Sequence, residues 1–381
     1  MLAWGWLPCP AALAQGRVQT VASPSSTTLT SGWSFYISTE GAFESNPNFL
    51  APPNDPSDFS GRAGGGFAFS HGGARGTFSL SGDGRSLFYR ELTNLDTLTF
   101  GGSMAGAYRP GPKTDLSFNG SVSSDYTRRS EILLSQGIVL PQSQVLTMRF
   151  NAGISHTLST RTTLSTTGRF ERAQFDSQNL NDGNTFGATA SLSRRVSRTL
   201  SLSAGYSHDQ IDSDVQKRSI DTGYGGVHLV VNPRTDLNLS AGASSTGGDA
   251  GARKVTPYGA ASINVKYPRL VLSLAYSHQI RQDYGVGRVS EADLATLNLN
   301  RTFGRRKVSL HSSLTYGLNR TSGSSAQDSS YRTYGATAGM QIPLARRLRA
   351  DWGYSYFRTS QALLIDSHSA FVALSYRMEL H

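Results

Sequence analysis

Apolar side chains alternate with small polar side chains along most of the chain. In the segment TDLSFNGSVSSDY (114–126), one parity carries Leu116, Phe118, Val122 and Tyr126, and the other carries Asp115 and a series of Ser and Asn residues. Residues 145–158, 235–243, 307–319 and 333–344 alternate in the same way. Because successive side chains of a strand point to opposite faces, this period predicts β-strands with one apolar face and one polar face.

Basic residues recur in short segments of turn-like composition, such as RPGPKTD around Lys113 and NPRTDLNL around Arg234. Their spacing is mostly about 37 residues, and a membrane strand takes about 9–11 residues with some extension beyond the bilayer. One interval therefore holds a rising strand, a loop and a falling strand. We expect the basic turns to lie together at one end of a barrel, at Arg75, Lys113, Arg161, Arg198, Arg234, Arg269, Arg306, Arg346 and Arg347.

The alternation and the turns predict a single transmembrane, antiparallel, up-and-down β-barrel of about eighteen strands with short periplasmic turns. About sixteen strands is the alternative, because segments 221–232 and 369–380 are weaker predictions. Loops 46–60, 129–144, 245–254 and 321–331 are expected on the outer side. The predicted strands are residues 32–45, 61–72, 76–90, 96–109, 114–128, 145–158, 162–176, 185–197, 199–212, 221–232, 235–247, 255–267, 269–284, 292–303, 307–321, 331–344, 347–361 and 369–380.

Three features favour a membrane barrel over a soluble β-sandwich or propeller. The polar face carries mostly Ser, Thr, Gly and Asn instead of Lys and Glu. The turns on one side are shorter than those on the other. Aromatic residues follow the apolar runs, where an interface girdle would lie; they are Tyr206, Tyr276, Tyr316 and Tyr354.

Composition supports the same fold class. Charged residues make up only 16% of the chain, against about 25% in soluble globular proteins. The net charge of +10 raises a nucleic-acid hypothesis, but the basic residues form no single run and no nucleic-acid-binding motif is present, so we predict no nucleic-acid partner. No run of about 20 apolar residues occurs, which leaves a periplasmic protein or a barrel in the outer membrane.

The first residues have the character of an export signal. Residues 1–16 carry no charge, and an apolar stretch ends in Ala12-Leu13-Ala14, which is similar to a signal-peptidase site. We predict a signal peptide over residues 1–14, truncated at its basic start, then a periplasmic segment over 15–31 and the barrel over 32–380. A lipoprotein anchored at Cys9 is the less favoured alternative, because Pro8 stands where a small residue is expected.

Nothing in the sequence predicts an enzyme, a metal site or a cofactor. Catalysis by a barrel needs a nucleophile, a base and an orienting group in contact, whereas the histidines are scattered over different strands and loops. No metal-ligand spacing occurs. The glycine-rich segment GRAGGGF (61–67) is followed by strand-like sequence, so a phosphate loop is not indicated there. The histidines are His71, His156, His208, His228, His278, His311, His368 and His381.

Charged residues on the polar parity are candidates for the solute path. A water-filled lumen accepts such residues, and rings of them set the selectivity of a pore. A positive bias would favour anionic solutes; alternatively, acids and bases pair and only stiffen the wall. The candidate residues of the path are Arg62, Arg85, Arg149, Arg169, Arg195, Lys266, Arg281 and Arg349.

Residues 39–52, TEGAFESNPNFLAP, resemble the start of the β-barrel porin type 2 proteins. Those proteins begin with an apolar strand that runs into a short acidic and Asn-Pro-like segment, here residues 44–48. The architecture is also similar to alginate-export barrels. The resemblance implies an exopolysaccharide-associated barrel in the outer-membrane lipid, with a polysaccharide as substrate and periplasmic polysaccharide-export proteins and the barrel-assembly machinery as partners.

Three functions follow from these observations. The first is a channel that exports an exopolysaccharide or capsular polymer through a partly basic lumen. The second is a general or anion-preferring diffusion porin, which would need an inward-folded constriction loop; the candidate for that loop is 129–144, and it is apolar. The third is a surface-binding or adhesion barrel, which would need larger outer loops than the predicted strands leave.

Overall fold

The computed structural model describes residues 31–50, 56–127, 140, 142–248, 253–304, 307–321, 329–360 and 364–380. The predicted signal peptide lies outside the described residues, as does almost all of the predicted segment 15–31. No helix within the described ranges is long and apolar enough to cross a membrane.

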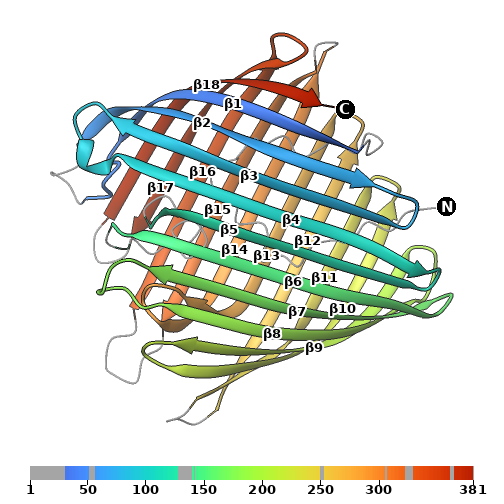
Figure 1. Ribbon diagram of the computed structural model, residues 1–381. Coiled ribbons are helices and arrows are strands. Elements are labelled where there is room, and N and C mark those ends of the chain that lie inside the picture. The colour runs from blue at the N-terminus through green and yellow to red at the C-terminus, as the bar shows by residue number, and fades with distance from the viewer. Residues whose placement is uncertain are drawn as a thin grey trace.

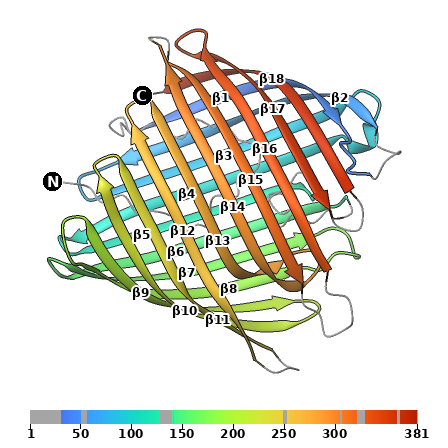
Figure 2. The same cartoon turned by 180° about the vertical axis from the view of Figure 1, so that it is seen from behind.

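Eighteen antiparallel strands form one closed barrel, because β1 pairs with β18 as well as with β2 (Figures 1 and 2). Figure 1 shows the blue-to-green wall of the first half of the chain, and Figure 2 shows the yellow-to-red wall behind it. A short 3₁₀ helix, η2 (Thr93–Leu95), lies between β3 and β4. The strands are β1 (Gly32–Ser45), β2 (Ser57–Gly72), β3 (Gly76–Tyr89), β4 (Thr97–Gly111), β5 (Thr114–Tyr126), β6 (Gln144–Ser159), β7 (Thr162–Phe175), β8 (Gly183–Arg195), β9 (Leu200–Ser213), β10 (Lys217–Asn232), β11 (Thr235–Gly248), β12 (Lys254–Tyr267), β13 (Leu270–Asp283), β14 (Arg288–Phe303), β15 (Val308–Thr321), β16 (Ser329–Pro343), β17 (Leu348–Ser360) and β18 (Leu364–Leu380).

The predicted fold class is confirmed, with eighteen strands and not sixteen. Both weakly predicted segments are strands: β10 covers 221–232, and β18 covers 369–380. Trp33 pairs with Leu380, so the first and last strands have their outer termini at one end of the barrel. The described basic turns lie at that same end, which we call the turn end; Arg306 lies outside the described residues. Bacterial barrels place such short turns in the periplasm, and we call the other end the loop end.

The alternation predicted from sequence separates an outer face from a lumen face. On β1, Phe35, Ile37 and Phe43 are exposed on the outside, whereas Ser34 and Glu44 on the opposite parity are buried in the barrel interior. The tyrosines predicted for a girdle lie on the outer face towards the loop end, and the rings of Tyr316 and Tyr334 are 5.3 Å apart. Trp33, with its ring 4.8 Å from that of Phe69, belongs to a second aromatic group at the turn end. Two aromatic groups that flank an apolar band are typical of a barrel in a bilayer.

One hairpin leaves the wall of the barrel at the loop end. The β12–β13 ladder stops at Gly259 and His278, although β12 continues outward to Lys254 and β13 to Asp283. Beyond that point β13 still pairs with β14, and β14 with β15. Residues 279–292, which we call the inner hairpin, therefore bend into the barrel. Pro257 lies on the stretch of β12 left without a β13 partner, and a residue without an N–H suits such an edge.

Candidate functional site: the lumen and its loop end

The lumen wall along β5 is polar and accessible to water. Ser117, Asn119, Ser121 and Ser123 all face inward and are exposed. The amide of Asn119 accepts a hydrogen bond from Asn151 Nδ2 on β6 at 3.0 Å. These short side chains follow from the small polar parity of the sequence, and they leave space along this wall. A surface of hydroxyls and amides can hydrate hydrophilic solutes.

Arg62 lies at the centre of a charged network near the loop end. Its guanidinium is 2.8 Å from Glu40 Oε1 and 3.1 Å from Glu44 Oε1. The same Glu44 carboxylate accepts hydrogen bonds from Ser60 Oγ at 3.1 Å and from Tyr89 OH at 2.8 Å. Because Glu44 is buried, its carboxylate depends on these donors. Arg62 faces the interior as expected, and its contacts join β1, β2 and β3.

Three more candidate arginines also have acidic neighbours on the lumen face. Arg149 Nε is 2.9 Å from Glu171 Oε1, and Arg169 Nη2 is 2.8 Å from Asp209 Oδ1. Arg85 Nε lies 3.3 Å from Asp83 Oδ2 on the same strand. The first pair joins β6 to β7, and the second joins β7 to β9 across β8. Paired charges of this kind stiffen a wall and offer less net field to a passing ion than unpaired arginines would.

The remaining candidates lie at separate places. Arg281 lies on the inner hairpin, 3.8 Å from Asp283 Oδ1, and its Nη2 donates to Asn319 Oδ1. Arg195, Lys266 and Arg349 face inward at the turn end, where Arg195 donates to the carbonyl of Thr160 at 3.4 Å. The register therefore places all the candidate residues on the lumen side but does not gather them into one site. Their role in a solute path stays a prediction.

The described lumen face carries almost as many acids as bases. This balance does not support a strong positive bias, because a lumen of nearly equal opposite charges has little net potential. The inward bases are Arg62, Arg85, Arg109, Arg149, Arg169, Arg195, Arg218, Lys254, Lys266, Arg281, Arg288, Arg349 and Arg377. The inward acids are Glu40, Glu44, Asp58, Asp83, Asp115, Asp125, Glu171, Asp209, Asp236, Asp283, Asp351 and Glu379.

The inner hairpin packs on an apolar patch of the lumen wall formed by β9 and β10. Ile211 on β9 and Ile220 on β10 face the lumen, where the other residues are mostly polar, and both are almost fully buried. Val289 and Ile280 of the hairpin pack against them in one cluster. Burial of these side chains explains why apolar residues interrupt the polar parity at positions 211 and 220.

The tip of the inner hairpin is held by polar contacts to the loops between β7 and β10. Gly285 and Asn181 exchange two backbone hydrogen bonds, of 2.9 Å and 3.2 Å, as an isolated antiparallel bridge. Gln216 Nε2 donates to the carbonyl of Gly287 at 2.9 Å. Thr185 Oγ1 on β8 donates to Gln282 Oε1 at 2.7 Å. The tip therefore reaches from β13 past the ends of β9–β12 to β8 and the loop between β7 and β8.

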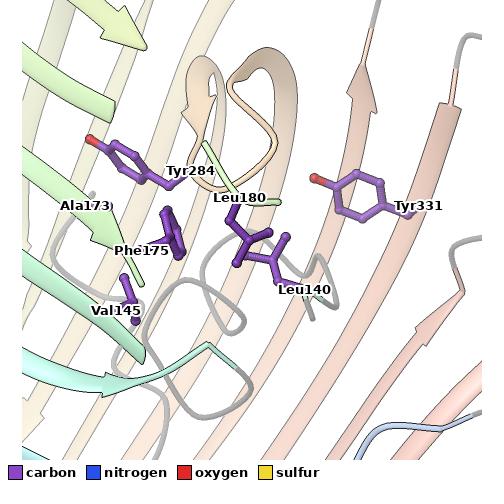
Figure 3. Packing of buried hydrophobic residues seen from close by; sticks show 7 residues of the cluster. All are labelled: Leu140, Val145, Ala173, Phe175, Leu180, Tyr284 and Tyr331. Carbon is purple, nitrogen blue, oxygen red and sulfur yellow. The ribbon is translucent and has the colours of Figure 1, made fainter. Parts of the chain in front are cut away.

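A second apolar cluster crosses the mouth of the barrel (Figure 3). Tyr284 of the hairpin tip packs with Leu180 and Phe175, and Tyr331 of β16 belongs to the same cluster. In the strand order, β7 and β16 lie half-way round the barrel from each other. Burial raises the pKa of the Tyr284 phenol, whose oxygen lies 3.1 Å from Thr185 Oγ1. Side chains from two opposing walls thus narrow the loop end. The cluster comprises Leu140, Val145, Ala173, Phe175, Leu180, Tyr284 and Tyr331.

Glycines allow the hairpin to lie this close to the wall. Gly285 has φ +80°, and a Cβ there would lie 2.6 Å from Leu140 Cδ1. On β8, a Cβ at Gly183 would overlap the amide group of Gln282. Gly285 is therefore required by both its positive φ and its close contact, and Gly183 by its close contact alone.

The sequence predicted a constriction in a different segment. Most of loop 129–144 lies outside the described residues, but Leu140 and Val145 at its end belong to the cluster across the mouth. Residues 279–284 of the inner hairpin were predicted as the end of wall strand 269–284 and residue 292 as the start of strand 292–303, with the residues between them left outside the predicted strands. The signals that could have indicated it are the two apolar lumen positions, Pro257 inside a predicted strand, and the Gly-Val-Gly sequence at 285–287. Within the described ranges no group of acidic, His or Cys side chains could hold a metal ion.

Residues 134–232 match the model of the family described as "Putative beta-barrel porin 2". This match agrees with the resemblance noted at residues 39–52. The search of curated proteins returns no match. The closed barrel and its two aromatic groups are those of an outer-membrane β-barrel, and residues 134–232 are similar to a porin family.

Several solved outer-membrane proteins are similar in overall shape. Pseudomonas aeruginosa OpdL is 11% identical, with 92% of this chain and 99% of that chain covered and a TM-score of 0.47. Acinetobacter baumannii OccAB4 is 10% identical, with 93% and 99% covered and a TM-score of 0.47. The siderophore receptor PirA of Pseudomonas aeruginosa is 8% identical, with 92% and 81% covered and a TM-score of 0.46. At these identities the likeness concerns the fold and not a substrate.

Proposed function

We propose that this chain is a diffusion porin of the outer membrane for small hydrophilic solutes. The observation that carries the proposal is the combination of a water-exposed polar wall along β5 with a loop end narrowed by the inner hairpin. Barrels of 16–18 strands are wide enough to hold an aqueous channel. An inward-folded segment then sets the size of the solutes that pass.

The charge balance supports weak ion selectivity. Arg62, Arg149 and Arg169 all have carboxylates within 3.1 Å, so their fields are largely cancelled by their neighbours. An anion-preferring porin would need arginines that present an uncompensated charge to the path. We therefore expect the channel to discriminate only weakly between anions and cations.

Polysaccharide export, which the family resemblance implied, has little support in the lumen. A polymer would have to pass the cluster that joins β7 and β16 across the loop end. Arg62, Arg149 and Arg169 are paired with acids, and the basic residues of the described lumen face form no continuous track, as an acidic polymer would require. The diffusion porin, which was the alternative to export, fits these features better, and partners from an export system are not needed for it.

Swelling of proteoliposomes in solutions of uncharged sugars tests the proposal. A diffusion porin admits monosaccharides quickly and larger oligosaccharides progressively more slowly, because the hairpin limits the width of the path. Liposomes that hold a heat-denatured sample of the same protein are the control. No swelling with any sugar would contradict the porin. Swelling that a long acidic polysaccharide blocks at low concentration would favour export instead.

A further inference from the structure

The residues of the inner hairpin also fit a second position, in the wall beside β12. The β12–β13 register continues beyond Gly259 and His278 if the hairpin straightens. Continuation of that register brings Val255 opposite Gln282 and Lys254 opposite Asp283. Nothing in the covalent chain opposes this, because β11–β12 pairing already extends to Lys254. Beyond Gly259, β12 therefore has no β13 pairing on that edge, and the hairpin is the segment whose register fits it.

The apolar residues of the hairpin determine which position is the more populated. In the structure, Ile280 and Val289 pack against Ile211 and Ile220 inside the lumen. Their parity is that of the outward-facing Tyr276 and Leu297. In a straightened hairpin they would therefore face outward beyond Tyr276, with Ile280 beside Pro257. Apolar burial thus favours the docked position and makes the aligned position a minor state.

Lys254 has an acidic partner available in both positions. In the structure its Nζ is 2.6 Å from Glu291 Oε1, and Thr256 donates to the same oxygen at 3.3 Å. In the straightened register, Lys254 would lie opposite Asp283, on the lumen face. Asp283 now accepts a hydrogen bond from Ser290 Oγ at 3.0 Å within the hairpin. Lys254 can therefore pair with Glu291 in the docked position of the hairpin and with Asp283 in the straightened one.

The height at which the β12–β13 ladder ends limits the free energy that is lost when the hairpin leaves the wall. The ladder breaks just beyond Tyr276, one of the girdle residues, so the unpaired edge of β12 lies at the height of the lipid headgroups. Unpaired backbone groups are costly in the hydrocarbon but can be hydrated at the interface. Pro257 also removes one N–H that would otherwise need a partner.

We propose that residues 279–292 form a gate that moves between the docked position and a wall-aligned position paired with β12. The gate rests on the proposed porin function, since it regulates the same lumen. In the docked position the hairpin narrows the loop end through the cluster around Tyr284. In the aligned position the β12–β13 ladder is complete, and the cluster across the mouth loses its central member.

Two disulfide locks test the gate, each in a chain with Cys9→Ser. The pair I220C and V289C links residues of the docked cluster, and the pair V255C and Q282C links residues that come opposite only in the aligned register. Disulfide formation is read from gel mobility after mild oxidation, and current is recorded in planar bilayers with and without reductant. If the aligned state is a minor one, the aligned lock raises the time-averaged current, and the rise approaches about tenfold at about 10% occupancy when the aligned state carries nearly all of the current. The docked lock lowers it, and reductant reverses both effects.

The controls separate the gate from the porin. Each single-cysteine variant is recorded with and without reductant, and its current does not respond to reductant. The gate is overturned if the V255C and Q282C disulfide does not form, or if both locks form and the current of a conducting barrel stays the same. A barrel that conducts in neither state overturns the porin function, whereas formation of both disulfides in that barrel still shows that the hairpin reaches both positions.

Discussion

Lys254 Nζ lies 2.6 Å from Glu291 Oε1, although β13 separates their strands, β12 and β14, in the order of the barrel. Glu291 has the outward parity of its strand and Lys254 has lumen parity, so the two side chains would lie on opposite faces of a flat wall and can meet only where the hairpin has left it. Lys254 faces the lumen, and Glu291 lies on the side of the inner hairpin that turns towards β12. This ion pair therefore marks the inward fold of the hairpin and helps to hold it in place.

Loss of this ion pair should release the hairpin. We expect Glu291→Gln to increase the fraction of time spent in a high-conductance state, because the charge attraction to Lys254 is lost in the docked position. The measurement is single-channel recording in planar bilayers. Asp212→Asn is the matched control, since Asp212 pairs with Lys217 at 3.5 Å on the outer face. An equal change in both variants would contradict the assignment.

A side chain at Gly183 should push the tip off the wall. A Cβ there overlaps the amide of Gln282, so Gly183→Ala should weaken the contact between β8 and the hairpin. We expect faster uptake of the larger sugars in liposome swelling. Gly168→Ala on β7 is the control, because nothing lies within 4 Å of the added carbon. Unchanged sugar uptake in Gly183→Ala would show that the hairpin does not limit the path.

Adjacent residues on β6 test the assignment of the two faces. Phe150 is exposed on the outer face near the middle of the strand, and Asn151 faces the lumen. Arginine at position 150 should cost about 2–4 kcal/mol of folding free energy in a bilayer, because it places a charge in the hydrocarbon. Arginine at position 151 should cost much less. Urea unfolding from phosphatidylcholine vesicles measures both, and equal losses would contradict the register.

Arg62 should matter for stability more than for selectivity. Arg62→Ala leaves the buried Glu44 carboxylate without its cationic neighbour, which we expect to cost about 1–3 kcal/mol. The double variant Arg62→Ala with Glu44→Gln should recover part of this loss. Urea unfolding gives the stability, and the reversal potential in a salt gradient gives the selectivity. A large change in reversal potential with unchanged stability would make Arg62 a path residue and not a structural one.

The sequence was sufficient for the wall of the barrel. Parity and turn spacing predicted every strand, including β10, because a period of two in a membrane barrel has a physical cause at each position: lipid on one side and water on the other. The basic turns around Arg75 and Arg234 predicted which ends of the strands lie together. These features depend on neighbours close in the chain or on the bilayer itself.

The constriction could not be predicted in the same way. Ile280 and Val289 have the parity of wall residues, and only their contact with Ile211 and Ile220 shows that the hairpin folds inward. That contact joins segments far apart in the chain, and alternation says nothing about such contacts. Whether the lumen charges pair was left open for a similar reason. Arg169 on β7 meets Asp209 on β9 across β8, where Gly187 has no side chain between them.

Conductance of the unmodified protein in a planar bilayer tests the central claim most directly. We predict discrete current steps, and a reversal potential close to zero under a tenfold salt gradient, because the lumen acids and bases nearly balance. A bilayer that shows no steps at any amount of added protein would contradict a porin. Steps with a reversal potential near the limit for a single ion would contradict a charge-balanced path.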